Sequence, residues 1–176
     1  MNAVRSIAGI LHYLSRFISI LVLFVAIYAT VVILLHLNNP SSKLPFRVLD
    51  NGSFQLFFPF TKSPFLLGDY TTSFLVSNLL IITFYGLFLW LLADVFHAFK
   101  QPRLFTPSGV LRLSRFYITN LIVPFVFILL LSVFGNELLD MVRITLLHLV
   151  IGVFAYFMAA IFKQGLVLQE EQDLTL

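Results

Sequence analysis

The sequence FISILVLFVAIYATVVILLHL, residues 17–37, decides the class of this protein. It contains no Asp, Glu, Lys or Arg. The hydrocarbon core of a bilayer is about 30 Å thick and is crossed by about 20 apolar residues in a helix. Within that core every backbone N–H and C=O must be paired inside the segment, which a helix achieves. The stretch therefore predicts a transmembrane helix.

Three further apolar stretches reach a similar length: Ser73–Phe96, Phe116–Gly135 and Arg143–Phe162. The 176 residues are 60% hydrophobic and 11% charged, whereas soluble domains average roughly 45–50% and 25%. A bundle of four such helices accounts for the length of the chain, so residues 1–176 are expected to form a single domain. The predicted fold class is an all-α membrane protein, a four-transmembrane-helix bundle.

The Lys and Arg residues gather at the ends of the apolar stretches. Such positions are typical of charges that anchor helices at a lipid bilayer. The net charge of +3 therefore indicates membrane contact and no direct nucleic-acid binding. The first apolar stretch is about twice as long as the core of a signal peptide, so it is expected to be retained. The absence of cysteine excludes disulfides and thiolate metal sites.

The same charges predict the orientation through the positive-inside rule. With the N-terminus inside, the cytoplasmic segments carry Arg5, Arg16, Lys100, Arg103, Arg112, Arg115 and Lys163. The outer segments then carry only Lys43, Arg47, Lys62 and Arg143. We expect a multi-pass membrane protein with both termini cytoplasmic and residues 38–72 outside.

The outer segment 38–72 contains a hairpin signal. Asp50–Gly52 separates Phe46–Leu49 from Ser53–Phe58, two runs rich in β-forming residues. Asn-Gly between such runs favours a two-stranded hairpin, because both residues tolerate positive φ. We expect a small extracytoplasmic β-hairpin cap, which is either a lid on the bundle or a ligand-sensing element. The side chains expected to be buried beneath it are Phe57, Phe58 and Phe60.

Two other segments bear on the architecture. The outer connection Asn136–Val142 is short, so the third and fourth helices are expected to be antiparallel neighbours. Val4–His12 has the apolar spacing of a helix. It either lies along the inner interface or extends the first helix into the cytoplasm.

Few polar side chains interrupt the apolar stretches, and such groups are costly in lipid. Asn78 and His148 fall at about the same depth below the outer boundary, so we expect them to meet across the bundle. Asn120 is placed near the inner end of the third helix. These three intramembrane residues either form interhelical hydrogen bonds or mark a ligand or proton site.

The sequence holds no catalytic, cofactor-binding or metal-binding pattern. His-Glu-x-x-His, Gly-x-Ser-x-Gly and phosphate-binding glycine loops are all missing. Channels and pumps usually line their path with charges or broken helices, and these stretches supply little of either. We therefore expect neither an enzyme nor a bound cofactor.

Two cytoplasmic motifs of opposite charge remain. Thr106 and Pro107 predict the start of a helix that leads into the third stretch, with Arg112 and Arg115 one turn apart. After Gly165, the tail carries three acids. Either the tail bends at the glycine and its acids pair with the arginines, or the arginines contact lipid phosphates and the acids keep the tail soluble. The predicted cytoplasmic interaction motif is Arg112, Arg115, Glu170, Glu171 and Asp173.

The same two segments carry a family resemblance. LFTPSGVLRL, residues 104–113, is similar to an element Phe-Thr/Ser-x-x-Asn-Val-x-Arg-Leu-Arg, and GLVLQEEQDLTL, residues 165–176, to a closing Gly-x-x-Leu-x-Glu-Glu-Asn-Asp-Leu-Thr. Both belong to a bacterial four-span membrane family catalogued as domain of unknown function 2975. This sequence departs at Gly109 and Gln172, where Asn is usual, and at Ser114, where Arg is common. The resemblance implies no established activity. It implies a cytoplasmic partner, because members are commonly encoded beside a small helix-turn-helix regulator.

The sequence thus favours a non-enzymatic regulatory or scaffolding protein of the inner membrane, whose cytoplasmic motif holds a partner such as a helix-turn-helix transcription regulator. The alternative is a small transporter or lipophilic-ligand-binding protein that uses Asn78 and His148. The two hypotheses differ in where polar groups converge, on the inner face or at mid-depth. Homo-oligomerisation stays open.

Overall fold

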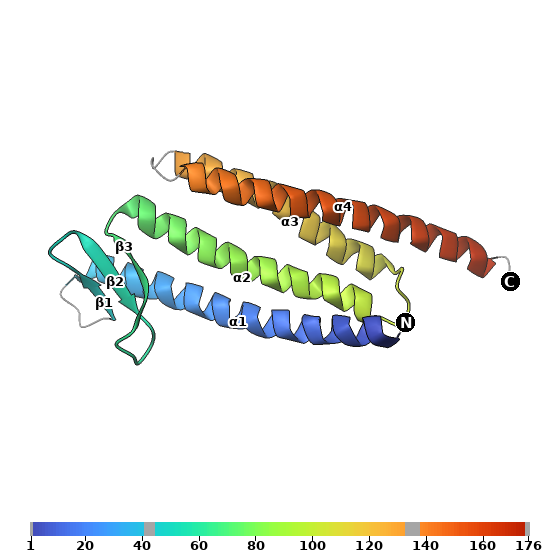
Figure 1. Ribbon diagram of the computed structural model, residues 1–176, viewed down its shortest axis with the longest axis horizontal. Coiled ribbons are helices and arrows are strands. Elements are labelled where there is room, and N and C mark those ends of the chain that lie inside the picture. Colours follow the sequence, from blue (N-terminus) through green and yellow to red (C-terminus); the bar gives the residue numbers. More distant parts are fainter. Residues whose placement is uncertain (1, 41–44, 133–137, 175–176) are drawn as a thin grey trace.

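A computed structural model describes residues 2–40, 45–132 and 138–174, most of which lie in four long helices (Figure 1). The helices are α1 (Asn2–Asn38), α2 (Thr72–Lys100), α3 (Pro107–Ser132) and α4 (Leu138–Leu174). Between α1 and α2 lie the strands β1 (Phe46–Val48), β2 (Ser53–Phe57) and β3 (Pro64–Asp69). The end of the third predicted stretch and the first residues of the connection after it fall outside the described residues.

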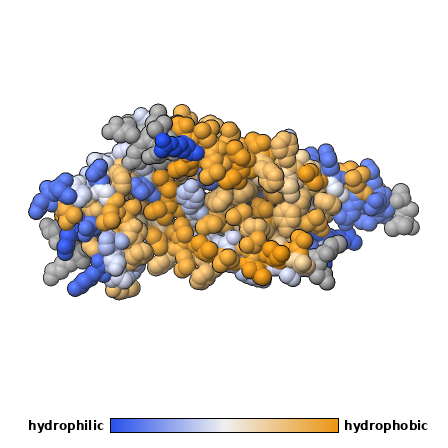
Figure 2. Space-filling view, viewed as in Figure 1, coloured by the Kyte–Doolittle hydropathy of each residue, from blue (hydrophilic) through white to orange (hydrophobic). Residues whose placement is uncertain are grey.

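All four helices are long and apolar enough to cross a membrane, as the sequence predicted. Less than a third of each apolar stretch is buried inside the molecule, so apolar side chains also cover the outside of the helices. Figure 2 shows a broad hydrophobic band around the middle of the molecule and hydrophilic surface gathered mainly at its two ends.

All four helices are longer than their apolar stretches, and the extensions of α1 and α4 bear on the predictions. α1 begins at Asn2, so Val4–His12 extends the first helix. α4 continues to Leu174, so the expected bend at Gly165 is wrong. The residues that follow this glycine are mainly good helix formers, and one glycine costs a helix only about 1 kcal/mol.

The helices pack as two antiparallel pairs, α1 with α2 and α3 with α4, joined by contacts between α2 and α3. Among the described residues, α1 packs extensively only against α2, so the four helices do not close into a ring. Glycines permit the close approaches. A Cβ on Gly86 would lie 2.6 Å from the side chain of Leu23, and a Cβ on Gly152 would lie 2.7 Å from that of Leu121.

The two ends of the molecule differ (Figure 1). At one end, which we call the loop end, lie the start of α1, the connection 101–106 and the last turns of α4. At the other, the sheet end, the strands cross the end of α1. The N-terminal end of α1 and the C-terminal end of α4 are therefore on the same side of the hydrophobic band.

The small sheet is antiparallel with strand order β1-β2-β3. The predicted β1–β2 hairpin is confirmed, and Gly52 occupies its turn with φ of 78°. Strand β3 was not predicted from the sequence. Its first residue is Pro64, and an edge strand tolerates there a residue with no N–H to donate.

One face of the sheet packs on the ends of α1 and α2. Phe54 and Leu56 are fully buried there, against Ile33 of α1 and Leu75 of α2. The expected burial of three other phenylalanines is wrong. Strand alternation turns Phe57 to the opposite face, and the exposed residues Phe58 and Phe60 lie in the turn after β2.

Candidate functional site

Asp94 forms the centre of a charged cluster near the loop end. One carboxylate oxygen, Oδ1, accepts a hydrogen bond from Arg16 Nη2 at 2.6 Å and another from Arg112 Nη1 at 2.8 Å. The carboxylate side chain is only 15% exposed. Because the three residues belong to α2, α1 and α3, the cluster ties three helices together.

Aromatic and imidazole groups surround this cluster. The guanidinium carbon of Arg16 lies 3.8 Å from the ring centre of Trp90, a cation–π contact. His12 Nδ1 donates to the backbone oxygen of Ala93 at 2.7 Å, and its ring lies 5.0 Å from that of His97. The described residues contain no group of three or more potential metal ligands. The arrangement can hold helices in register, and it offers no nucleophile beside a base.

Asp94 was not among the residues predicted from the sequence, although a signal was present. It is the only acidic residue within the four apolar stretches. A lone acid in such a stretch needs a cationic partner, because an unpaired charge there is costly. Its partners could not be chosen from the sequence, since several Lys and Arg residues lie at similar positions along the helices.

The two sequence motifs meet through apolar packing. Phe105, in the connection before α3, lies with its ring 5.5 Å from that of Phe162, and a Cβ on Gly165 would come within 2.6 Å of the Phe105 ring. Thr106 begins α3 as predicted, because its Oγ1 accepts from Gly109 N at 3.1 Å. The glycine in the second motif therefore admits an aromatic ring from the first.

The expected ion pairing of Arg112 and Arg115 with the tail is not found among the described residues. Arg112 is paired with Asp94, and Arg115 points to solvent. The tail acid Asp173 lies 3.9 Å from Arg103 Nη1, with both side chains largely exposed. Such a pair contributes little to stability. The tail does not fold back because it is the last part of a continuous helix.

Residues 166–174 form what we call the distal segment of α4. Figure 1 shows α4 extending past the ends of the other helices at the loop end. In this segment the acids Glu170 and Glu171 are exposed, and so are the apolar side chains of Val167 and Leu168. The distal segment thus presents exposed acidic and apolar groups side by side.

The polar residues of the apolar stretches pair differently from the expectation. His148 Nδ1 donates to Asn120 Oδ1 at 2.7 Å, and both side chains are almost fully buried. Asn78 instead donates to the carbonyl of Phe74 on its own helix. The expected meeting of Asn78 with His148 is therefore wrong, as is the placement of Asn120 near the inner end.

In the structure, Asn120 and His148 lie at similar depths in the hairpin formed by α3 and α4. Asn120 precedes the end of α3 by about 18 Å, and His148 follows the start of α4 by about 15 Å, at 1.5 Å per residue. Aromatic rings enclose the imidazole, with centres at 4.7 Å for Phe84 and 5.2 Å for Phe88. Among the described residues Nε2 has no hydrogen-bond partner, so the ring carries its proton on Nδ1.

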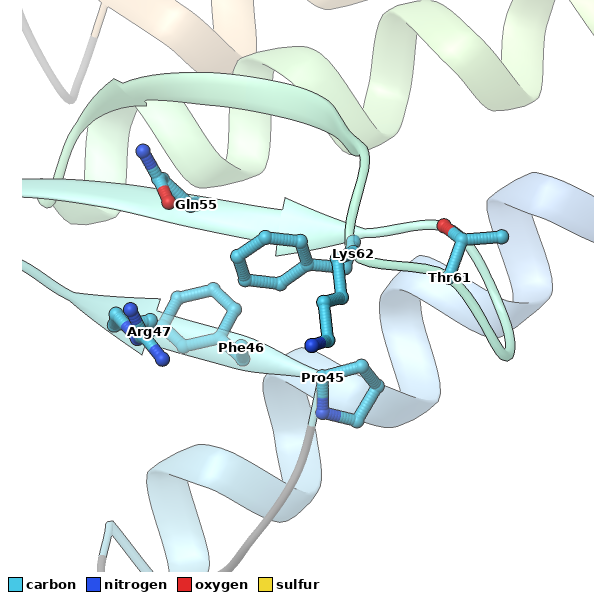
Figure 3. Close-up of a pocket in the computed structure, with 7 residues that line it drawn as sticks. Pro45, Phe46, Arg47, Gln55, Thr61 and Lys62 are labelled. Carbon is cyan, nitrogen blue, oxygen red and sulfur yellow. The ribbon is translucent and has the colours of Figure 1, made fainter.

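Two of the cavities bear on function. A hollow of about 540 Å³ lies on the outer face of the sheet (Figure 3), where Arg47 and Lys62 are the cationic lining residues. A second cavity of about 340 Å³ lies between α2, α3 and α4 and is lined by apolar side chains, among them Phe88, Phe116 and Met158.

Comparisons with known proteins return no match for this chain, either among family models, among curated proteins or among solved structures.

Proposed function

We propose that this protein is an integral protein of the bacterial inner membrane that acts as a non-enzymatic regulatory or scaffolding component. Its distal segment of α4 binds a cytoplasmic partner. The observation that carries this proposal is the continuation of α4 beyond its neighbours, with the exposed acids Glu170 and Glu171 beside exposed apolar side chains.

Insertion in a membrane is supported by the four apolar helices and their hydrophobic outer surface. The loop end carries most of the Lys and Arg residues, which favours a cytoplasmic position for it and for both termini. The distal segment then projects into the cytoplasm, where a soluble protein can reach it.

The partner is proposed to present a basic surface with an apolar centre. Glu170, Glu171 and Asp173 supply negative charge, while Val167 and Leu168 supply exposed apolar area on the same helix. Charged groups at the rim of such a surface favour encounter and orientation, and apolar groups supply much of the affinity. A small helix-turn-helix regulator, which carries a basic surface for DNA, fits this chemistry.

We also propose that the chain is a member of the family catalogued as domain of unknown function 2975. The support for this membership is that the two segments on which the resemblance rests are in contact, Phe105 of one against Gly165 of the other. Arg112 is not proposed as a partner-binding residue, because Asp94 holds it.

Site-specific photocrosslinking tests the partner surface. A benzoylphenylalanine at Leu168 should crosslink a co-expressed helix-turn-helix regulator, and Glu170→Lys with Glu171→Lys should reduce the yield at least about tenfold. The same probe at Phe154, an exposed residue in the middle of α4, is the matched control and should give no such crosslink. Equal crosslinking at both positions, or a yield unaffected by charge reversal, would refute the proposed surface.

The alternative function, a small transporter or lipophilic-ligand binder, has one supporting observation. The apolar cavity of about 340 Å³ between α2, α3 and α4 could hold part of an acyl chain. Asn78 no longer supports this alternative, since its amide bonds to its own helix. Bilayer lipid would fill such a cavity in any membrane protein, so we favour the regulatory function.

A further inference from the structure

The turn after β2 holds a fully exposed aromatic residue in an unusual backbone conformation. Phe60 has φ of 61°, the one positive φ found at a non-glycine residue in the described part of the chain. Phe60 is fully exposed, and Phe58 in the same turn is 42% exposed. Bulky residues adopt positive φ rarely, so a conformation that presents this ring outward needs a reason.

The position of the turn supplies that reason. The hydroxyl of Tyr28 in α1 donates to the carbonyl of Phe57 at 3.0 Å. Tyr28 lies ten residues before the end of α1 at Asn38, which places the turn about 15 Å back along the helix. Figure 1 shows the loops of the sheet lying beside α1. The turn thus lies next to the apolar surface of α1.

A cationic hollow lies beside the same turn (Figure 3). Arg47 of β1 pairs across the sheet with Gln55 of β2, and both line the hollow together with Thr61 and Lys62 of the turn. In Figure 3 the nitrogen of Lys62 points toward Pro45, at the start of β1. The lining residues include no carboxylate. Two cations without a lining acid form a site for an anion.

The positive-inside rule makes these two cations informative. Lys and Arg are disfavoured on the outer side of a membrane protein, and Arg47 and Lys62 lie on the side proposed to be outside. Both line one hollow beside exposed phenylalanines. Aromatic side chains at an interface with cations near them are the usual elements of protein–lipid recognition.

We propose that the turn after β2 binds the outer surface of the bilayer and that the hollow holds the phosphate headgroup of an anionic lipid. Phe58 and Phe60 lie at the boundary between headgroups and acyl chains. Arg47 and Lys62 donate hydrogen bonds to the phosphate oxygens, a charge-assisted interaction. This inference rests on the proposed insertion of α1 in a membrane.

Fluorescence quenching by brominated lipid tests the proposal on the full chain in nanodiscs. Trp90→Phe removes the one native tryptophan, and Phe60→Trp then places a reporter in the turn. We expect quenching by brominated phosphatidylcholine, and stronger quenching, by about twofold or more, when the same mole fraction of bromine is carried by phosphatidylglycerol. Arg47→Gln with Lys62→Gln should abolish the preference, while Lys163→Gln at the loop end should leave it unchanged.

A second reporter separates this proposal from the one on which it rests. Phe24→Trp, in the exposed apolar part of α1, should be quenched strongly if the helix crosses the bilayer. Quenching at position 24 without quenching at position 60 refutes the docking of the turn alone. A preference for phosphatidylglycerol that survives loss of both cations refutes the headgroup site. No quenching at position 24 refutes membrane insertion, and with it the proposed function.

Discussion

Asp94 is the centre of the charged contacts between α1, α2 and α3. It accepts hydrogen bonds from Arg16 and Arg112, and each of these cations comes from a different helix. Removing the acid would leave two partly buried guanidinium groups close together. The cost of leaving a charged group unpaired exceeds the value of a neutral hydrogen bond.

We therefore expect Asp94→Asn to lower the free energy of unfolding by about 1–3 kcal/mol. Thermal unfolding of the detergent-solubilised protein measures this as a lower midpoint temperature. Asp173→Asn is the matched control, because it removes an acid from an exposed pair and should change stability by less than about 0.5 kcal/mol. Equal effects of the two substitutions would show that Asp94 does not hold the helices together.

The amides of Asn120, which is buried, and Asn78, which is partly buried, offer a second comparison. Asn120→Ala removes the acceptor of the His148 proton, leaves a fully buried imidazole without a partner, and should cost about 1–2 kcal/mol. Asn78→Ala removes only a bond within α2 and should cost less. The same unfolding measurement distinguishes them. A larger loss for the Asn78 variant would contradict the assigned pair.

Among the secondary-structure elements, α4 packs against the connection 101–106 at the loop end. Near Phe162, α4 contacts Phe105 of the connection 101–106, and Gly165 leaves space for the Phe105 ring. The helix then continues to Leu174 as the distal segment. The contact of Gly165 with Phe105 therefore marks the start of the distal segment.

Gly165→Ala should displace the connection, because the new Cβ would lie 2.6 Å from the Phe105 ring. We expect trypsin to cut after Arg103 about fivefold faster or more, since proteolysis follows local opening. Phe105→Ala in the same chain should relieve the clash and remove the difference that Gly165→Ala makes. The control is Gly9→Ala, where a Cβ would meet nothing within 4 Å. Unchanged cleavage of the Gly165 variant would contradict the contact.

At the scale of the whole molecule, the sheet end and the loop end lie on opposite sides of the hydrophobic band. The N-terminal end of α1 and the C-terminal end of α4 are together at the loop end. The orientation of the chain in a membrane therefore determines on which side of it the sheet, its cationic hollow and the distal segment lie.

Cysteine labelling tests that orientation, and the chain has no native cysteine to interfere. A membrane-impermeant maleimide added to intact cells should modify Ser63→Cys at the sheet end. It should modify Leu174→Cys only after the inner membrane is permeabilised. Labelling of the second variant alone in intact cells would reverse the proposed topology.

Features that depend on near neighbours along the chain could be predicted from the sequence. The apolar stretches predicted the four helices, Thr106 the start of α3, and Asn51 and Gly52 the first hairpin turn. Each rests on local hydropathy or on backbone preferences within a few residues. The exposed apolar surface also follows from composition, because no other part of a chain this hydrophobic could cover it.

Only the tertiary structure decided which side chains meet. A helix turns by about 100° per residue, so a small rotation of α2 or α3 changes which side chains face the neighbouring helix. That rotation pairs Asn120 with His148, turns Asn78 to its own backbone and directs Arg112 to Asp94. The register of β3 and the approach of Phe105 to Gly165 likewise depend on segments far apart in the chain. Long-range packing sets these pairings, and no local preference encodes them.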